Sequence, residues 1–149
     1  MKIFIFLLAV TVVYGQHSHS CVHSNHDMHT ADHVIDWVIR EMDHNQDGNV
    51  SDSEIIAEFI ISFDTHPHDL KIDHDEFVHR WQNHYRDVRH FAEYLWLHMD
   101  TNHDHVLDSG DLTAIIRDMD GDLDGTVTTH EFKLWMEDLY KNCKTVQRP

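Results

Sequence analysis

Acidic side chains recur at alternate positions from Asp120 to Asp124, and Glu131 follows seven residues later. Carboxylate oxygens at this spacing can surround a hard cation, and Ca²⁺ takes about six to eight oxygen ligands. Gly125 lies where a chain wrapped around such an ion must turn sharply, and glycine readily adopts the backbone angles of that turn. The spacing therefore predicts a twelve-residue calcium loop with ligands at Asp120, Asp122, Asp124, Thr126 (backbone carbonyl), Thr128 (through a water) and Glu131.

The same pattern occurs once more, nearer the N-terminus. Residues 43–54 repeat the spacing, with Gly48 at the turn position. The chain resembles the EF-hand superfamily in these two loops, and the resemblance extends over about residues 30–140. It implies an all-α fold in which a helix precedes and follows each loop. The ligands expected in this first loop are Asp43, Asn45, Asp47, Asn49 (backbone carbonyl), Ser51 and Glu54.

A weaker loop of the same kind covers residues 100–111. His105 stands where the turn favours glycine, and Asp111 replaces the glutamate that would supply two oxygens. We expect looser calcium binding here, because the shorter Asp111 side chain would reach the ion with one oxygen. The ligands expected in this third loop are Asp100, Asn102, Asp104, Val106 (backbone carbonyl), Asp108 and Asp111.

The segment from Asp64 to Glu76 is thirteen residues long and fits the pattern only in part. Counted from Asp64, histidines His66 and His68 occupy ligand positions, and counted from Glu76, Pro67 occupies one. Both alignments depart from a calcium loop. We expect this second loop to be degenerate and to serve a structural role in pairing with another loop. The loop at residues 120–131 is numbered the fourth.

Apolar residues before and after the loops recur with the 3.6-residue period of an amphipathic helix. Met42-Asp43 aligns with Met99-Asp100, which indicates two repeats at about 31–85 and 87–141. Helices are predicted at about 31–42, 52–62, 74–84, 87–98, 109–118 and 129–141. The apolar faces predicted to form the core include Ile35, Val38, Ile39, Met42, Ala92, Leu95, Trp96, Met99, Phe132, Trp135, Met136 and Leu139.

Loop spacing predicts which loops lie side by side. Nine residues separate Glu54 from Asp64, and eight separate Asp111 from Asp120, which leaves room for one short helix each time. At 1.5 Å per residue the loops at its two ends lie more than about 10 Å apart. We therefore expect the second loop to pair with the third, and the first with the fourth, through short β ribbons.

The first fifteen residues have the pattern of a secretory signal peptide. Lys2 precedes a short apolar stretch, and small or uncharged residues follow up to Gly15. A membrane anchor or a buried strand is the alternative, although the stretch is short for a membrane span. We expect cleavage before Gln16 and a secreted, extracellular protein. Its parts would be a disordered His-rich leader (16–30), an EF-hand domain (31–141) and a tail (142–149).

The chain is strongly acidic, with 27 Asp and Glu against 11 Lys and Arg and a formal net charge of −16. Such a surface repels nucleic acid and anionic membranes, and it favours divalent cations, mineral surfaces and basic proteins. The sequence offers no nucleophile–base pair, phosphate loop or catalytic metal constellation. We therefore do not expect an enzyme.

Two cysteines, Cys21 and Cys143, lie near opposite ends of the chain. In a secreted protein an even number favours a disulfide, and pairing of the first and fourth loops would bring the two ends together. The alternative is that Cys21 is a metal ligand within the histidine-rich leader.

Histidines are unusually frequent, and six of the seventeen fall between residues 17 and 33. Imidazole binds Zn²⁺ and Cu²⁺ well, and a flexible tract can wrap such ions without a preformed site. No fixed zinc-site spacing is present, so a solvated leader without specific binding remains the alternative. The candidate transition-metal ligands are His17, His19, His23, His26, His29 and His33.

These patterns predict a secreted calcium-binding protein in which calcium is structural or buffered. It is similar in this respect to secreted EF-hand proteins of invertebrates, including those of mineralising matrices. A Zn²⁺ or Cu²⁺ carrier that uses the calcium domain as a scaffold is one alternative. A calcium-dependent interaction module is another.

Overall fold

The computed structural model describes residues 29–143, which form six α-helices and one short antiparallel sheet. This architecture confirms the predicted all-α class. The helices are α1 (Ala31–Met42), α2 (Asp52–Phe63), α3 (His74–His84), α4 (Arg89–Met99), α5 (Ser109–Met119) and α6 (Thr129–Asn142), and the strands are β1 (Ile72–Asp73) and β2 (Val106–Leu107).

The helix whose start differs most from the sequence prediction is α4, which begins at Arg89 rather than at residue 87. Arg86 adopts a left-handed φ of 54°, and Asp87 is fully buried. The Asp87 Oδ1 atom accepts the N–H of Val88 at 2.6 Å. Asp87 therefore anchors the chain just before the helix instead of forming its first turn.

Four helices start at the last residues of a loop. The side chains of Ser51, Asp73, Asp108 and Thr128 accept backbone N–H groups at the N-termini of α2, α3, α5 and α6. In each case the carboxylate three residues later accepts the backbone N–H of the capping residue, which completes a capping box. The last four residues of each loop therefore also form the start of the next helix.

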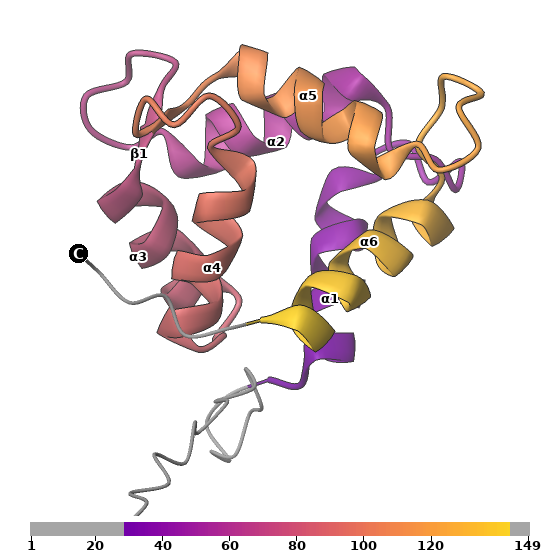
Figure 1. The fold of residues 1–149 in the computed structure, drawn as a ribbon, viewed down its shortest axis with the longest axis horizontal. Coiled ribbons are helices and arrows are strands. Elements are labelled where there is room, and N and C mark those ends of the chain that lie inside the picture. The colour runs from indigo at the N-terminus through magenta and orange to yellow at the C-terminus, as the bar shows by residue number, and fades with distance from the viewer. Residues whose placement is uncertain (1–28, 144–149) are drawn as a thin grey trace, which may run out of the picture.

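Helices α2 and α5 each connect two loops and lie alongside one another, with the remaining helices on the same side of them (Figure 1). Helix α2 runs from the first loop to the second, and α5 runs from the third loop to the fourth. Helix α3 packs against α4 at one end, and α1 packs against α6 at the other. Each end of the molecule therefore carries two loops that are distant in sequence.

The loops pair as their spacing predicts. At one end, β1 of the second loop pairs antiparallel with β2 of the third, and Ile72 faces Leu107. At the other end, a β-bridge joins Asn49 to Thr128, and Val50 N–H donates to the Val127 carbonyl at 2.7 Å. The apolar residue in the middle of each pairing segment is buried, so each ribbon also closes one end of the core.

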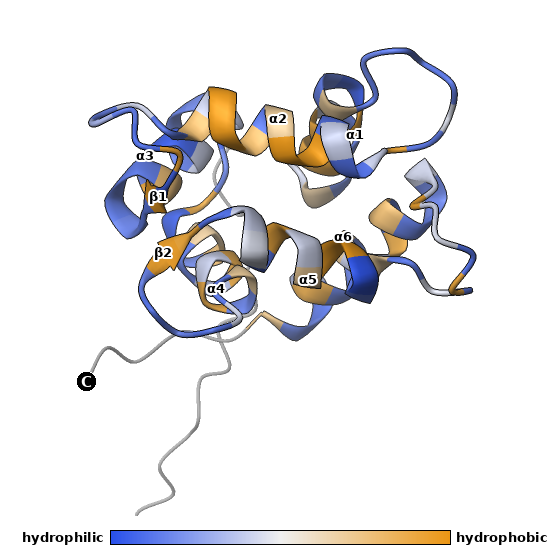
Figure 2. Cartoon of the chain, turned by 90° about the horizontal axis from the view of Figure 1, so that it is seen from above, coloured by the Kyte–Doolittle hydropathy of each residue, from blue (hydrophilic) through white to orange (hydrophobic). Residues whose placement is uncertain are grey.

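The core lies between the helices, and the apolar residues of α2 and α5 form bands along both helices (Figure 2). Its largest buried side chains are aromatic, and Phe63 stacks on Phe77 with ring centres 5.2 Å apart. The predicted core positions are buried, except that Ile39 and Trp135 are partly exposed at its edge. The 3.6-residue pattern therefore located the buried faces correctly.

A buried carboxylate ties α6 to the turn between α3 and α4. Asp87 has no exposed surface, and its Oδ2 atom accepts Trp81 Nε1–H at 2.8 Å and the Tyr140 hydroxyl at 2.5 Å. Burial, and then the Asp87 charge, raise the pKa of Tyr140, so this hydroxyl remains a donor. The Tyr140 ring also stacks on Phe91, with centres 3.6 Å apart. These contacts fix the end of α6 to the other half of the molecule.

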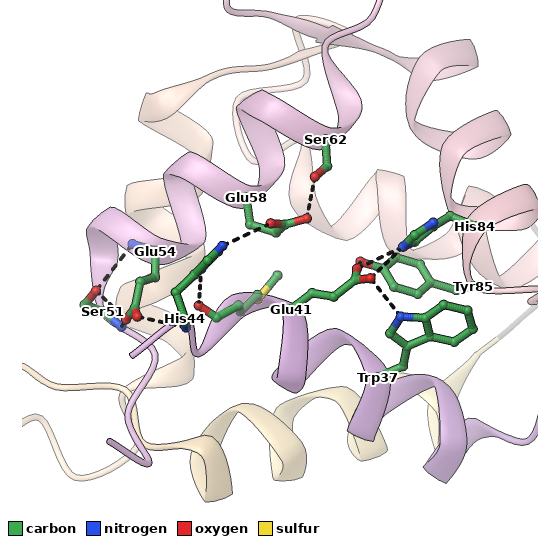
Figure 3. Close-up of polar contacts among 10 residues, drawn as sticks. Trp37, Glu41, His44, Ser51, Glu54, Glu58, Ser62, His84 and Tyr85 are labelled. Carbon is green, nitrogen blue, oxygen red and sulfur yellow. Dashed lines mark hydrogen bonds and ion pairs between the residues drawn. The ribbon is translucent and has the colours of Figure 1, made fainter. Parts of the chain in front are cut away.

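A second polar cluster joins α1 to the end of α3 (Figure 3). Glu41 accepts Trp37 Nε1–H at 2.8 Å, His84 Nε2–H at 2.8 Å and the Tyr85 hydroxyl at 3.0 Å. Burial by itself raises the pKa of Glu41, but the hydrogen bonds from His84, Trp37 and Tyr85 outweigh it and hold the pKa below its ordinary value. Glu41 therefore stabilises the fold as a carboxylate.

Replacement of Glu41 by glutamine is expected to lower the free energy of unfolding by about 1 kcal/mol at pH 7. The folded pKa of Glu41 is depressed, so its contribution is present above the ordinary value of 4.5 and is lost as the pH falls through the folded pKa. Urea unfolding of both proteins from pH 7 downwards measures the difference. Glu137→Gln is a matched control, because Glu137 is also 28% exposed and forms an ion pair with Lys141 on the same helix. A difference that persists unchanged well below pH 4 would contradict the assignment.

The predicted signal peptide, most of the predicted leader and the end of the tail lie outside the described residues. His29 and Thr30, which we placed in the leader, already belong to the folded part, because His29 N–H donates to the Arg86 carbonyl and Thr30 caps α1. Cys143 is disulfide-bonded, and its expected partner, Cys21, is outside the described range. Within residues 29–143 no helix has the length and apolar character needed to cross a membrane.

Candidate metal centres

The fourth loop brings three carboxylates to one point. Oxygens of Asp120, Asp122 and Asp124 lie within 4.8 Å of one another. Asp120 accepts the N–H of Asp124 at 3.2 Å and that of Gly125 at 2.9 Å, so its side chain holds the loop in a ring. Of the remaining predicted ligands, Thr126 is exposed. The loop thus collects hard oxygen donors at its centre, as a divalent cation needs.

Glu131 closes this ring from the first turn of α6. Its Oε1 atom accepts the N–H of Gly121 at 3.0 Å, and its Oε2 atom accepts the N–H of Thr128 at 2.9 Å. Hydrogen bonds from the backbone and then the hydroxyl of Thr128 hold the pKa of Glu131 below its ordinary value. Both carboxylate oxygens are therefore held, ionised, at the mouth of the loop.

The first loop repeats this geometry at equivalent residues. Asp43 accepts the N–H groups of Asp47 and Gly48, each at 3.1 Å. The Glu54 carboxylate accepts the His44 N–H through Oε1 at 3.1 Å and the Ser51 N–H through Oε2 at 2.9 Å (Figure 3).

The other first-loop ligands are held by short bonds within the ring. Asn45 Oδ1 accepts the N–H of Asp47 at 2.8 Å, and Asp47 Oδ1 accepts that of Asn49 at 2.8 Å. Hydrogen bonds from the Ser51 hydroxyl and backbone hold the pKa of Glu54 below its ordinary value. The side chains of Asp43, Asn45, Asp47 and Glu54 thus hold the backbone of the first loop in the same way as their counterparts hold the fourth.

The third loop reaches the same arrangement with a shorter closing residue. Asp111 is buried, and its two oxygens accept the N–H groups of Thr101 at 2.9 Å and Asp108 at 3.3 Å, as the glutamates do in the other loops. One oxygen of Asp111 also lies within 4.8 Å of carboxylate oxygens of Asp100 and Asp104. The aspartate therefore does reach the ring, through at least one oxygen.

Two left-handed residues shape each of these three loops. Gly48 and Gly125 have φ values of 86° and 88°, and a Cβ at either would meet nothing within 4 Å, so the backbone angle alone requires glycine. His105 adopts a φ of 68° at the equivalent position. A residue with a side chain is strained at this angle, as the sequence predicted. The fourth position of each loop is also left-handed, at Gln46, His103 and Leu123, and nothing in those residue types signals it.

The second loop keeps both ends of the pattern and gains a residue between them. Leu70 N–H donates to Asp64 Oδ2 at 2.8 Å, as the turn residue does elsewhere, and Leu70 has a φ of 65°. Glu76 accepts the N–H groups of Thr65 at 2.9 Å and Asp73 at 3.0 Å. The insertion therefore falls between Asp64 and Leu70, a point that sequence alignment from either end left open.

Only two of the six candidate leader histidines are described. His29 and His33 stack with ring centres 4.2 Å apart at the start of α1, and Trp37 lies against both rings. His33 is an exposed residue of α1 itself. The structure thus places two imidazoles together, whereas His17, His19, His23 and His26 lie outside the described residues.

The carboxylate clusters suit a hard divalent cation better than any anion or neutral ligand. In the third and fourth loops, carboxylate oxygens lie within 4.8 Å of one another, and an oxygen-seeking cation would relieve their repulsion. Comparison with known proteins adds nothing to this geometry, because no protein-family model, curated protein or solved structure matches the chain.

Proposed function

We propose that this chain is a secreted calcium-binding protein of the EF-hand type, with calcium bound in the first and fourth loops and more weakly in the third. The observation that carries the proposal is the fourth loop, where three carboxylates converge on one point and Glu131 closes the ring. Six to eight oxygens in a flexible ring are what Ca²⁺ requires, and carboxylates, a carbonyl and a water supply them here.

The pairing of loops supports the same conclusion. Each metal ring is joined to another through buried apolar residues, Val50 with Val127 at one end and Ile72 with Leu107 at the other. Cation binding in one ring therefore stiffens the segment that positions its partner. This link explains why a second loop with poor calcium ligands is still present in the fold.

The shared helices favour a structural or buffering role for calcium over a switching role. Helix α2 leaves the first loop and enters the second, and α5 does the same between the third and fourth. A helix that rotated to open one loop would therefore have to displace another loop at its far end. Extracellular sites of this class have dissociation constants of roughly 10⁻⁴ to 10⁻³ M, so calcium outside the cell would largely fill them.

Isothermal titration of the metal-free chain with Ca²⁺ is expected to show two equivalent sites and one weaker site. Glu54→Gln and Glu131→Gln should each remove one of the two stronger sites, because each loses the carboxylate that closes its ring. Asp111→Asn should remove the weaker site and leave the other two. Glu137→Gln, an exposed-surface change on α6, serves as the control.

The proposal would be overturned if calorimetry detected no heat of calcium binding to protein that circular dichroism shows to be folded. Unchanged binding in the Glu54→Gln, Glu131→Gln double variant would overturn the assignment of the two rings.

A further inference from the structure

We propose that the second loop is a transition-metal site of the Zn²⁺ class, with Asp64, His66 and His68 as its ligands. This site is separate from the proposed calcium rings and from the leader histidines. The inference goes beyond the proposed function and does not depend on it.

The Asp64 carboxylate has one oxygen that is buried and unsatisfied. Asp64 is 3% exposed, and its Oδ1 atom has no hydrogen-bond partner, although Leu70 N–H satisfies Oδ2. The His68 ring lies near this oxygen, with its Nδ1 atom 4.0 Å away. A buried carboxylate oxygen without a partner is unfavourable, and a bound cation would offset that cost.

Among the four loops, only the second leaves this oxygen of its first aspartate without a hydrogen bond. The first aspartates of the other three loops use the equivalent Oδ1 atom to accept an N–H four residues later, at 3.1 Å for Asp43 and 3.2 Å for both Asp100 and Asp120. The residue inserted before Leu70 removes that donor from Asp64. The same oxygen is thus freed in the loop that carries histidines at the third and fifth positions, counted from Asp64.

Imidazole changes the metal that such a ring prefers. His66 and His68 follow Asp64 at the alternate positions where the first and fourth loops carry Asn or Asp. Ca²⁺ takes oxygen ligands, whereas Zn²⁺, Cu²⁺ and Ni²⁺ bind imidazole nitrogen well. The two substitutions therefore make the loop a poor calcium site and a good site for a borderline metal with one carboxylate and two imidazoles.

The His68 ring lies beside the Asp64 carboxylate, and the His66 ring lies beside that of His68. His68 Nδ1 is 2.8 Å from the Asp64 carbonyl oxygen, and the His66 and His68 ring centres are 5.6 Å apart. Two ligands on tetrahedral zinc lie about 3.4 Å apart. The three donor atoms do not yet lie within 4.8 Å of one another. Rotation of the two imidazoles can close that gap, because both are exposed and the His68 side chain is 74% accessible.

Glu76 is not expected to be a ligand. Its Oε1 atom accepts N–H groups from Thr65 and His66, and its Oε2 atom accepts that of Asp73. The site therefore has three protein ligands and leaves the fourth position of a tetrahedral ion to water.

The test is Zn²⁺ titration of the full chain at saturating Ca²⁺, with the six candidate histidines of the leader changed to Asn, namely His17, His19, His23, His26, His29 and His33. The double variant His66→Asn, His68→Asn is expected to lose about tenfold or more in zinc affinity. The matched control is His103→Asn, His105→Asn, which removes two exposed histidines of the third loop at the same spacing but outside ligand positions. The control is expected to bind zinc as the parent does.

A second measurement does not rely on the variants. Carbethoxylation of His66 and His68 by diethyl pyrocarbonate, mapped by mass spectrometry, is expected to slow when zinc is added, while that of His103 and His105 does not. Equal zinc affinity in the parent and the His66→Asn, His68→Asn variant would overturn the inference, as would equal carbethoxylation of His66 and His68 with and without zinc. Calcium binding is read separately by calorimetry, so failure here leaves the proposed calcium function intact.

Discussion

Removal of calcium with EDTA is expected to lower the thermal midpoint of this chain by roughly 15 °C relative to the calcium-saturated state. At a free calcium concentration about 100 times the dissociation constant, each site contributes about 2.7 kcal/mol of stability by mass action. Two such sites contribute about 5 kcal/mol, and each kilocalorie shifts the midpoint by about 3 °C for a domain of this size. The effect should be large because the proposed calcium sites exist only in the folded chain.

The carboxylate clusters are the reason to expect a less stable metal-free state. Oxygens of Asp120, Asp122 and Asp124 lie within 4.8 Å of one another, and their like charges repel when no cation separates them. The same applies to Asp100 and Asp104 in the third loop. High salt should therefore raise the thermal midpoint of the EDTA-treated chain, because it screens part of this repulsion.

Differential scanning calorimetry in calcium and in EDTA measures the shift. The double variant Glu54→Gln, Glu131→Gln is the decisive control, since it keeps the size of both side chains and removes the two carboxylates that close the first and fourth rings. We expect it to lose most of its response to calcium. A thermal midpoint that is the same in EDTA and in calcium for the unmodified chain would contradict the proposed sites.

Replacement of Asp87 by alanine is expected to lower the free energy of unfolding by about 3 to 4 kcal/mol. The change removes a fully buried acceptor, so Trp81 Nε1–H and the Tyr140 hydroxyl lose the hydrogen bonds that they donate to Asp87 Oδ2. Unsatisfied buried donors cost about 1 to 3 kcal/mol each. The loss also releases the end of α6, where Cys143 is buried.

Urea unfolding in saturating calcium measures this effect without interference from the metal sites. Tyr140→Phe removes one donor and keeps the ring stacked on Phe91, so it should cost only about 1 kcal/mol. Asp75→Ala removes a carboxylate that is 92% exposed and should cost less than about 0.5 kcal/mol. If Asp87→Ala costs no more than Asp75→Ala, the buried anchor does not contribute as the structure indicates.

Local spacing predicted the loop positions whose side chains the structure brings together in the third and fourth loops. Twelve consecutive residues hold each ring, so Asp120, Gly125 and Glu131 could be assigned from their order alone. The pairing of loops also followed from the sequence, because eight or nine residues between loops allow only one short helix. The start of α4 was wrong by two residues, since nothing local shows that Asp87 is drawn into the core before the helix begins.

The sequence by itself determined the all-α class, the helix boundaries to within one or two residues, and which loops meet. These features depend on the spacing of neighbouring residues, which the helical period and the loop pattern translate directly into geometry. Only the tertiary structure decided how distant residues meet. Glu41 finds His84, and Asp87 finds Tyr140, across 43 and 53 residues.

The second loop shows most clearly what the sequence determines and what only the tertiary structure determines. Its residue types show that His66 and His68 replace oxygen ligands, but not where the extra residue falls. The structure places that residue before Leu70, which leaves Asp64 Oδ1 without the N–H that its counterparts receive. One inserted residue shifts every backbone donor after it, so the unsatisfied oxygen could be found only from the folded chain.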